Sequence, residues 1–210
     1  MRLRYSCPRY VALMLLGLSG FAPPAIAQSP PERSAVELMD AVMWNREPIG
    51  GPFALIDHLG KRRTDADFRG KLMLVYFGFS YCPDICPTDL QQMGLAIDRL
   101  GTAGEAVQPV FITVDPERDT VEHLAEYVPL FHPRLIGLTG EPAAIHAAAR
   151  AYKAYYARVA IGAVDYTVDH SVFIYLMDRN GRYLGFFPPG TSAERMAEII
   201  RPHLFGTPKH

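Results

Sequence analysis

The chain has 210 residues, of which 49% are hydrophobic and 20% are charged, and its formal net charge is −1. This composition is typical of an ordinary globular protein and excludes a disordered or fibrous one. We therefore expect one compact domain with a substantial core.

The first 27 residues have the features of an export signal. Three arginines precede an apolar run over residues 10–21, and the run is followed by Ala25, Ile26 and Ala27, which place small residues where an export peptidase reads them. The apolar run is short for a bilayer span, which needs about 20 residues. We predict a signal peptide over residues 1–27, with an uncleaved anchor in the inner membrane as the alternative, and a location in the periplasm.

Removing this segment leaves 18 basic residues against 22 acidic ones. That mildly acidic balance argues against nucleic acid as a partner, because nucleic-acid-binding domains are strongly basic. Only two cysteines remain, Cys82 and Cys86. A pair four residues apart closes too small a loop to be a useful structural disulfide, so redox chemistry and metal binding are the favoured roles.

The rest of the chain alternates strand and helix patterns. Residues 28–50 are rich in proline and mixed polar residues and are predicted to be a linker, within which residues 34–44 could form a short helix; residues 51–206 are predicted to be the folded domain. Strands are expected at residues 53–56, 72–79, 110–114, 135–138, 172–176 and 183–187, and helices at residues 88–100, 120–131, 142–156 and 192–203. Asn180-Gly181 is a strong signal for a hairpin between the last two strands. This order predicts a three-layer α/β sandwich around a mixed sheet.

The two cysteines lie where a buried strand gives way to a helix. This is the carboxyl edge of the predicted sheet, where α/β proteins place their sites. If the segment is helical, Cys82 and Cys86 share one face, at a separation that suits either a shared metal ion or a disulfide. Free N–H groups and the positive end of the helix dipole stabilise thiolates at such a position.

Two further side chains are candidates at the same edge. Asp115 ends the strand after the cysteine helix, where it could orient a metal ligand; a role as a turn residue ahead of Pro116 is an equal alternative. Asp119 is expected to cap the next helix. His170 directly precedes a late strand, but its spacing alone does not distinguish it from the other histidines.

The sequence resembles the SCO/SenC family of thioredoxin-like copper proteins from about residue 51 to residue 204. The motifs that carry the resemblance are Asp67-Phe68-Arg69-Gly70-Lys71, Tyr76-Phe77-Gly78-Phe79, Cys82-Pro83-Asp84-Ile85-Cys86-Pro87, Asp115-Pro116-Glu117-Arg118-Asp119-Thr120, Gly137-Leu138-Thr139-Gly140 and Asp165-Tyr166-Thr167-Val168-Asp169-His170. The resemblance implies a thioredoxin fold in which Cys82, Cys86 and His170 bind one copper ion. It also implies delivery of that copper to the binuclear copper centre of cytochrome c oxidase subunit II.

The implied ligand set suits copper chemically. Two thiolates and an imidazole are soft ligands that satisfy three-coordinate Cu(I), and Cu(II) could bind with an added ligand. Zinc is a weaker candidate, because it would require a fourth ligand. Since metal binding requires reduced cysteines, a copper donor and a thiol reductant are expected partners.

A thiol-disulfide oxidoreductase acting on cysteines of the oxidase, or on another exported protein, is the alternative function. Thioredoxin-type redox proteins separate their cysteines by two residues, whereas three residues, Pro83, Asp84 and Ile85, separate them here. We interpret this longer spacing as favouring a metallochaperone over an enzyme.

Overall fold

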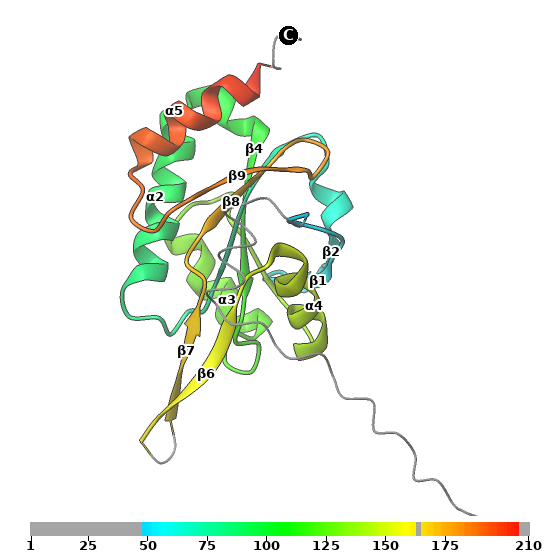
Figure 1. Ribbon diagram of the computed structural model, residues 1–210, viewed down its shortest axis with the longest axis vertical. Helices are drawn as coiled ribbons and strands as arrows, with labels where there is room; N and C mark the ends of the chain where they lie inside the picture. The colour runs from blue at the N-terminus through cyan, green and yellow to red at the C-terminus, as the bar shows by residue number, and fades with distance from the viewer. Residues whose placement is uncertain (1–47, 163–164, 206–210) are drawn as a thin grey trace, which may run out of the picture. The chain divides into compact units, whose positions relative to one another are not determined.

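The computed structural model describes residues 48–162 and 165–205, which form one α/β domain (Figure 1). The predicted export segment and the predicted helix at residues 34–44 lie outside the described residues. Ile49, within the predicted linker, is buried against the core, and the Gly50 amide donates a hydrogen bond to the Ala151 carbonyl. The final residues of the linker therefore pack as part of the domain.

A seven-stranded mixed sheet forms the centre of the domain, in the order β2-β1-β5-β4-β3-β8-β9. Its strands are β1 (Ala54–Asp57), β2 (Arg62–Thr64), β3 (Leu72–Gly78), β4 (Val107–Thr113), β5 (Ile136–Thr139), β8 (Ile174–Met177) and β9 (Tyr183–Phe187). Strands β3, β4 and β5 are parallel, and the others join antiparallel to their neighbours. Every residue of β3 and β4 is buried, as their apolar runs predict for strands covered on both faces.

Within the described residues, four α-helices and three short 3₁₀ turns complete the domain. The helices are α2 (Ile85–Arg99), α3 (Val121–Tyr127), α4 (Pro142–Tyr152) and α5 (Ala193–Leu204), and the turns are η1 (Asp65–Phe68), η2 (Gly101–Ala106) and η3 (Val128–Leu130). Helix α4 ends four residues earlier than predicted, because Lys153 takes a left-handed conformation that terminates it. Helix α2 begins at Ile85 rather than at residue 88, so it includes Cys86.

The helices cover both faces of the sheet. On one face, Phe111 of β4 contacts Tyr127 of α3, and α5 packs along α2. On the other face, Phe77 of β3 contacts Tyr152 of α4. Right-handed crossover connections place α2 and α3 on the same face of the sheet, and they place α4, where the chain returns across the sheet, on the opposite face. The observed contacts agree with this rule. The predicted thioredoxin-like three-layer sandwich is confirmed.

A two-stranded ribbon was not predicted. Strands β6 (Tyr156–Ile161) and β7 (Asp165–His170) pair antiparallel with each other and form a sheet of their own below the main one in Figure 1. The predicted helix reaches residue 156 and the next predicted strand begins at residue 172, so the sequence pattern does not indicate either strand of the ribbon. Strand β6 carries apolar residues such as Val159 and Ile161, but these side chains are exposed, so the strand forms by pairing with β7 rather than by burial in the core.

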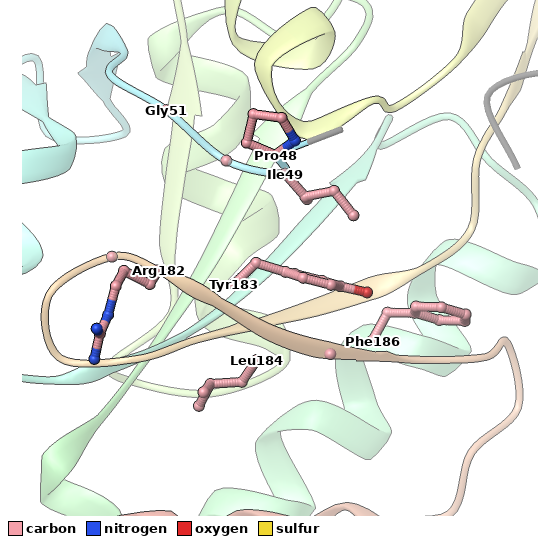
Figure 2. A pocket seen from close by; sticks show the side chains of 10 residues that line it. Pro48, Ile49, Gly51, Arg182, Tyr183, Leu184 and Phe186 are labelled. Atoms are coloured by element: carbon pink, nitrogen blue, oxygen red, sulfur yellow. The ribbon is translucent and has the colours of Figure 1, made fainter. Parts of the chain in front are cut away.

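A surface pocket opens beside β9, away from the cysteines. It is lined by residues 48–51 and 181–186, including Tyr183 and Phe186 (Figure 2). Neither cysteine nor His170 lines it. Among the described residues, no helix is long and apolar enough to cross a membrane.

Candidate metal centre

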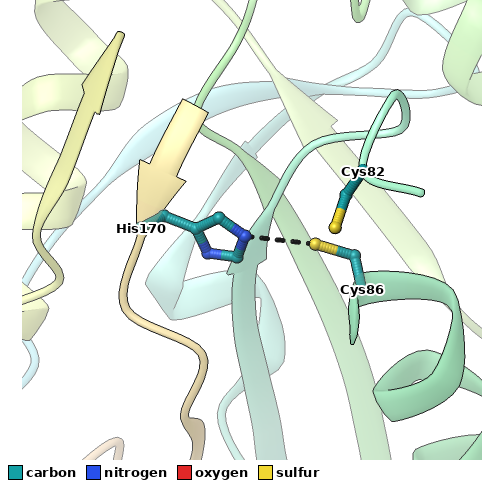
Figure 3. A group of neighbouring side chains, drawn as sticks. All are labelled: Cys82, Cys86 and His170. Atoms are coloured by element: carbon teal, nitrogen blue, oxygen red, sulfur yellow. Dashed lines mark hydrogen bonds between the residues drawn. The ribbon is translucent and has the colours of Figure 1, made fainter. Parts of the chain in front are cut away.

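The cysteine pair lies at the junction of β3 and α2. Cys82 occupies the turn after the strand, where its amide donates to the Phe79 carbonyl, and Cys86 lies in the first turn of the helix. Cys86 is fully buried and Cys82 is partly exposed; both are free thiols. Only Cys86 is helical, so the condition for a shared helix face is not met, although the two sulfurs still face each other (Figure 3).

His170 is the last residue of β7, and the end of the ribbon brings it to the cysteines. Its Nε2 lies 3.2 Å from Cys86 Sγ, and its Nδ1 lies 3.0 Å from the Ser171 carbonyl oxygen (Figure 3). Since a carbonyl only accepts, we assign the proton to Nδ1, which leaves the Nε2 lone pair directed at the cysteines. Metal-binding histidines are held in this way by a hydrogen bond from the other ring nitrogen.

Aromatic side chains wall the imidazole. The ring of Phe79 meets that of His170 edge-on at 5.7 Å between centroids, and the buried Tyr76 does so at 6.3 Å. These contacts fix the plane of the ring and exclude water from one side. The site is therefore closed toward the core and open where Cys82 is partly exposed.

The three predicted ligands converge on one point. The sulfurs of Cys82 and Cys86 and a ring nitrogen of His170 all lie within 4.8 Å of one another. Metal–thiolate bonds are about 2.3 Å long in zinc sites, so one ion can bridge donors at this separation. Within the described part of the chain, this is the one group of such side chains placed to hold a metal.

The two thiols differ in acidity. A hydrogen bond from the Cys86 thiol lowers the pKa of Cys82 far below that of an ordinary thiol, with further help from His170 and from backbone amides at the helix start. The same interaction, together with burial, raises the pKa of Cys86. Without metal, the pair is therefore a thiolate at Cys82 and a thiol at Cys86.

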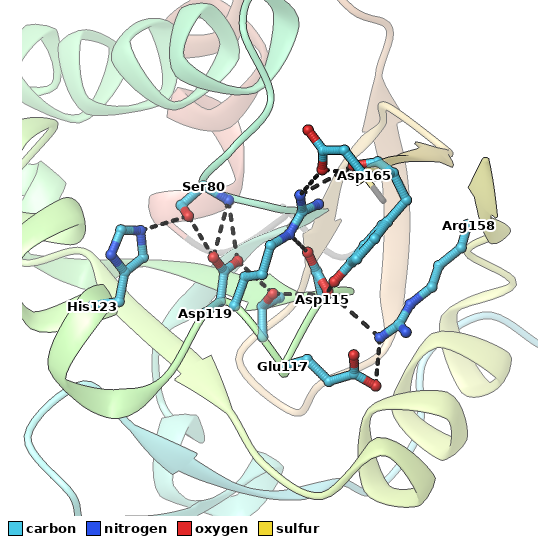
Figure 4. A network of polar contacts seen from close by, with 10 residues as sticks. Ser80, Asp115, Glu117, Asp119, His123, Arg158 and Asp165 are labelled. Carbon is cyan, nitrogen blue, oxygen red and sulfur yellow. Dashed lines mark hydrogen bonds and ion pairs between the residues drawn. The ribbon is translucent and has the colours of Figure 1, made fainter. Parts of the chain in front are cut away.

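Asp115 lies near the site but contacts none of its three ligands by a described hydrogen bond. Its side chain is fully buried and accepts hydrogen bonds from Arg118 Nε at 2.5 Å and from the Tyr166 hydroxyl at 2.8 Å (Figure 4). Its carbonyl also accepts from two amides of the following turn. Asp115 thus forms the predicted turn and, in addition, joins that turn to the ribbon that carries His170.

Asp119 is not the helix cap that the sequence suggested. Thr120 caps α3, because its hydroxyl accepts from the His123 amide. Asp119 is instead buried and accepts from Thr113 Oγ1 at 2.6 Å and from the Ser80 amide and hydroxyl (Figure 4). It anchors the cysteine loop two residues before Cys82.

Ser80 and His123 also support the cysteine loop, and neither is identified from the sequence. Ser80 Oγ also lies 2.7 Å from His123 Nε2, and the Tyr81 ring stacks on the His123 ring at 5.3 Å.

On α2, the buried Asp89 accepts from the Gly190 amide. Asp89 follows Cys86 by three residues, and this helical spacing is the signal that could have singled it out.

A family model described as SCO1/SenC matches residues 42–204. This chain belongs to the SCO1/SenC family. It is 47% identical to the mitochondrial SCO2 homolog of Mus musculus over 157 residues, which cover 73% of this chain and 62% of that protein. It is 46% identical to an SCO2-like protein of Rickettsia prowazekii, over 73% of this chain and 76% of that protein. The chain thus spans about three fifths of the mouse relative.

A solved structure shares the fold. The crystal structure of Arabidopsis thaliana ScoI with copper bound superposes with a TM-score of 0.71 at 44% sequence identity, covering 75% of this chain and 98% of that one. The SCO/SenC resemblance is therefore confirmed for both family and fold.

Proposed function

We propose that this protein binds one copper ion through Cys82 Sγ, Cys86 Sγ and His170 Nε2. The observation that carries the proposal is the convergence of these three atoms within 4.8 Å. Two thiolates and one imidazole match the softness of Cu(I) and complete a three-coordinate site without a fourth ligand. The copper-bound ScoI of Arabidopsis, with the same fold, supports this choice of metal.

The binding step releases a proton from the buried thiol. Cys82 already carries a thiolate in the metal-free pair, whereas Cys86 must lose its proton as its sulfur bonds to the metal. His170 needs no rearrangement of its proton, because Nδ1 keeps it in the bond to Ser171. Cys82 and His170 therefore need no change in their protons before the metal binds, and only Cys86 must be deprotonated.

Anaerobic titration of the reduced protein with Cu(I) tests this proposal. Against a competing chelator, we expect one equivalent to bind, and we expect His170→Ala to lower the affinity by at least about tenfold. His203→Ala, in the last turn of α5, is the matched control and should bind as the wild type does. Equal affinity in the His170 variant would contradict the three-ligand site.

We further propose that the copper is cargo for cytochrome c oxidase subunit II, and that the protein works in the periplasm after export by residues 1–27. The family assignment and the partly exposed Cys82 support delivery, because a transfer partner must reach at least one ligand. Mixing the Cu(I)-loaded protein with the copper-free soluble domain of subunit II, and then oxidising the product by one electron with ferricyanide, should produce the absorption bands of the mixed-valence binuclear centre. N-terminal sequencing of the periplasmic fraction tests the cleavage before Gln28.

A thiol-disulfide oxidoreductase is the second candidate, favoured by the unequal acidity of the two sulfurs. A partly exposed thiolate beside a buried thiol is an arrangement suited to attack and resolution. Measuring the reduction potential of the Cys82–Cys86 pair and its exchange rate with a dithiol tests this role. A very low potential with slow exchange would exclude it.

A further inference from the structure

The ribbon that carries His170 needs an anchor of its own. Strands β6 and β7 pair with each other and not with the seven-stranded sheet. A two-stranded hairpin is at best marginally stable by itself. Contacts with the body of the domain must therefore fix where the end of β7, and with it His170, lies.

Arg118 makes such contacts from the turn after β4. Its Nε donates to Asp115 Oδ2, its Nη1 donates to the Tyr166 carbonyl at 3.1 Å, and its guanidinium carbon lies 3.9 Å from the centre of the Tyr166 ring. The Tyr166 hydroxyl donates in turn to Asp115 Oδ1 (Figure 4). Body and ribbon are thus joined by a closed circuit of three side chains.

The same guanidinium also touches the cysteine side of the site. It lies 4.9 Å from the centre of the Tyr81 ring and 5.8 Å from that of Phe79. Tyr81 directly precedes Cys82, and Phe79 packs edge-on against His170. Arg118 therefore bridges the loop that presents the cysteines and the ribbon that presents the histidine.

Burial makes these contacts more than a surface ion pair. The Asp115 side chain is fully buried and that of Arg118 is 21% exposed, so solvent screens their interaction little. Removing the guanidinium would leave a buried carboxylate with only the Tyr166 hydroxyl as a close side-chain donor, a costly arrangement. The neighbouring Arg158 also lies near this carboxylate, with its Nη2 3.7 Å from Asp115 Oδ1, but it pairs at 2.8 Å with Glu117 and is 46% exposed, so it cannot replace the short hydrogen bond from Arg118 Nε.

We propose that Arg118 is a positioning residue that clamps the β6–β7 ribbon against the cysteine loop and thereby holds His170 at Cys86. The proposal rests on the function proposed above, because its main readout is copper affinity. The proposal predicts that Arg118 affects copper affinity only through the position of His170. A residue that merely stabilises the fold would not show this dependence.

A double-mutant cycle tests this coupling. We expect Arg118→Gln to lower Cu(I) affinity by about tenfold, within the range found for residues that orient metal ligands. In the His170→Ala background, the same change should lower it less than twofold, because no ligand remains for the clamp to position. Amides of β7 should exchange with solvent about tenfold faster in Arg118→Gln, while those of α2 keep the wild-type rate.

Arg63 provides the matched control. Its Nε donates to the fully buried Asp57 at 2.7 Å, and its side chain is 23% exposed, so the pair has the same atoms and nearly the same burial as Arg118–Asp115. Arg63→Gln should cost similar stability and leave copper affinity unchanged. If Arg118→Gln does not fold, Tyr166→Phe removes only the hydroxyl of the circuit and should weaken copper binding about threefold.

Three results would overturn the clamp. The first is unchanged copper affinity in Arg118→Gln, or in Tyr166→Phe if that variant has to be used instead. The second is a loss of copper affinity in Arg118→Gln that is equally large with and without His170. The third is an equally large loss of copper affinity in Arg63→Gln. If the wild-type protein binds no copper, the proposed function fails, whereas the hydrogen-exchange comparison still decides whether Arg118 holds the ribbon.

Discussion

Cys86 Sγ and His170 Nε2 lie 3.2 Å apart although 84 positions separate them in the chain. Cys86 belongs to a helix packed on the main sheet, whereas His170 ends a ribbon that pairs outside that sheet. The metal centre therefore forms between two parts of the fold. Its geometry depends on how the ribbon docks as much as on the cysteine loop.

The acidity of Cys82 predicts how the reduced, metal-free protein reacts with alkylating agents. A lowered pKa keeps Cys82 as a thiolate at pH values where an ordinary thiol, with a pKa of about 8.5, is protonated. The rate of alkylation by iodoacetamide, followed by mass spectrometry, should therefore change little between pH 8 and pH 6, with the label on Cys82. A rate that falls about tenfold per pH unit over this range would contradict the prediction. The Cys86→Ser variant tests the cause of the lowered pKa of Cys82, because serine replaces the thiol hydrogen-bond donor with a weaker acid.

The close packing around Gly78 provides a steric test of the site. A Cβ at this position would lie 2.9 Å from Tyr76 Cε1, 3.0 Å from Cys86 Sγ and 3.1 Å from Phe111 Cε2. Gly78→Ala should therefore displace the sulfur, weaken copper binding and cost about 1–3 kcal/mol of stability. Gly185→Ala, in strand β9, is the matched control, because nothing lies within 4 Å of its added Cβ. Urea unfolding and copper titration of both variants should separate them; identical behaviour would show that the strand relaxes around the methyl group.

The hydrogen bonds of Asp119 predict how much stability the protein loses when the cysteine loop is released. Asp119→Ala would remove the acceptor for the Ser80 amide and hydroxyl and for Thr113 Oγ1. We expect a loss of about 1–3 kcal/mol in the free energy of unfolding, because buried donors lose their partner. Glu105→Ala, at an exposed position, should change it by less than about 0.5 kcal/mol. The prediction is wrong if the two variants unfold at the same urea concentration.

Asp57 predicts a pH-dependent contribution to stability. Burial raises its pKa, but hydrogen bonds from the Arg63 side chain and from the amides of Lys61 and Leu59 outweigh burial and lower it overall. A folded-state pKa below the unfolded value of about 3.9 means that the ionised carboxylate stabilises the fold above that pH and loses this effect as the pH falls through the folded value.

The neutral variant Asp57→Asn tests that sign. It should be about 1.5–3 kcal/mol less stable than the wild type at pH 7, because hydrogen bonds to a charged group are lost. The difference should shrink as the pH falls below about 4, where the wild-type carboxyl also becomes neutral. Urea unfolding at pH 7, 5 and 3 measures it, and a difference that stays constant or grows toward acid pH would contradict the assignment.

The sequence by itself determined the layered core and the cysteine pair. Strands β3 and β4 are buried along their whole length, and such strands produce continuous apolar runs that are visible without a structure. The position of Cys82 and Cys86 between a buried strand and a helix follows from the same local patterns. The family motifs added His170, which no local pattern distinguished.

Tertiary structure alone decided how the third ligand reaches the first two. Strands β6 and β7 have mostly exposed or half-buried side chains and pair with each other rather than with the main sheet, so burial in the core does not reveal them. The sequence suggests Asp115 as a turn residue or a residue that orients a metal ligand, and Asp119 as a helix cap. In the structure Asp115 joins the ribbon through Arg118, and Asp119 holds the cysteine loop. Local sequence patterns report which side chains face the core. They do not report which distant polar groups the packing of the core brings together, and the coordination geometry at Cys86 and His170 depends on those groups.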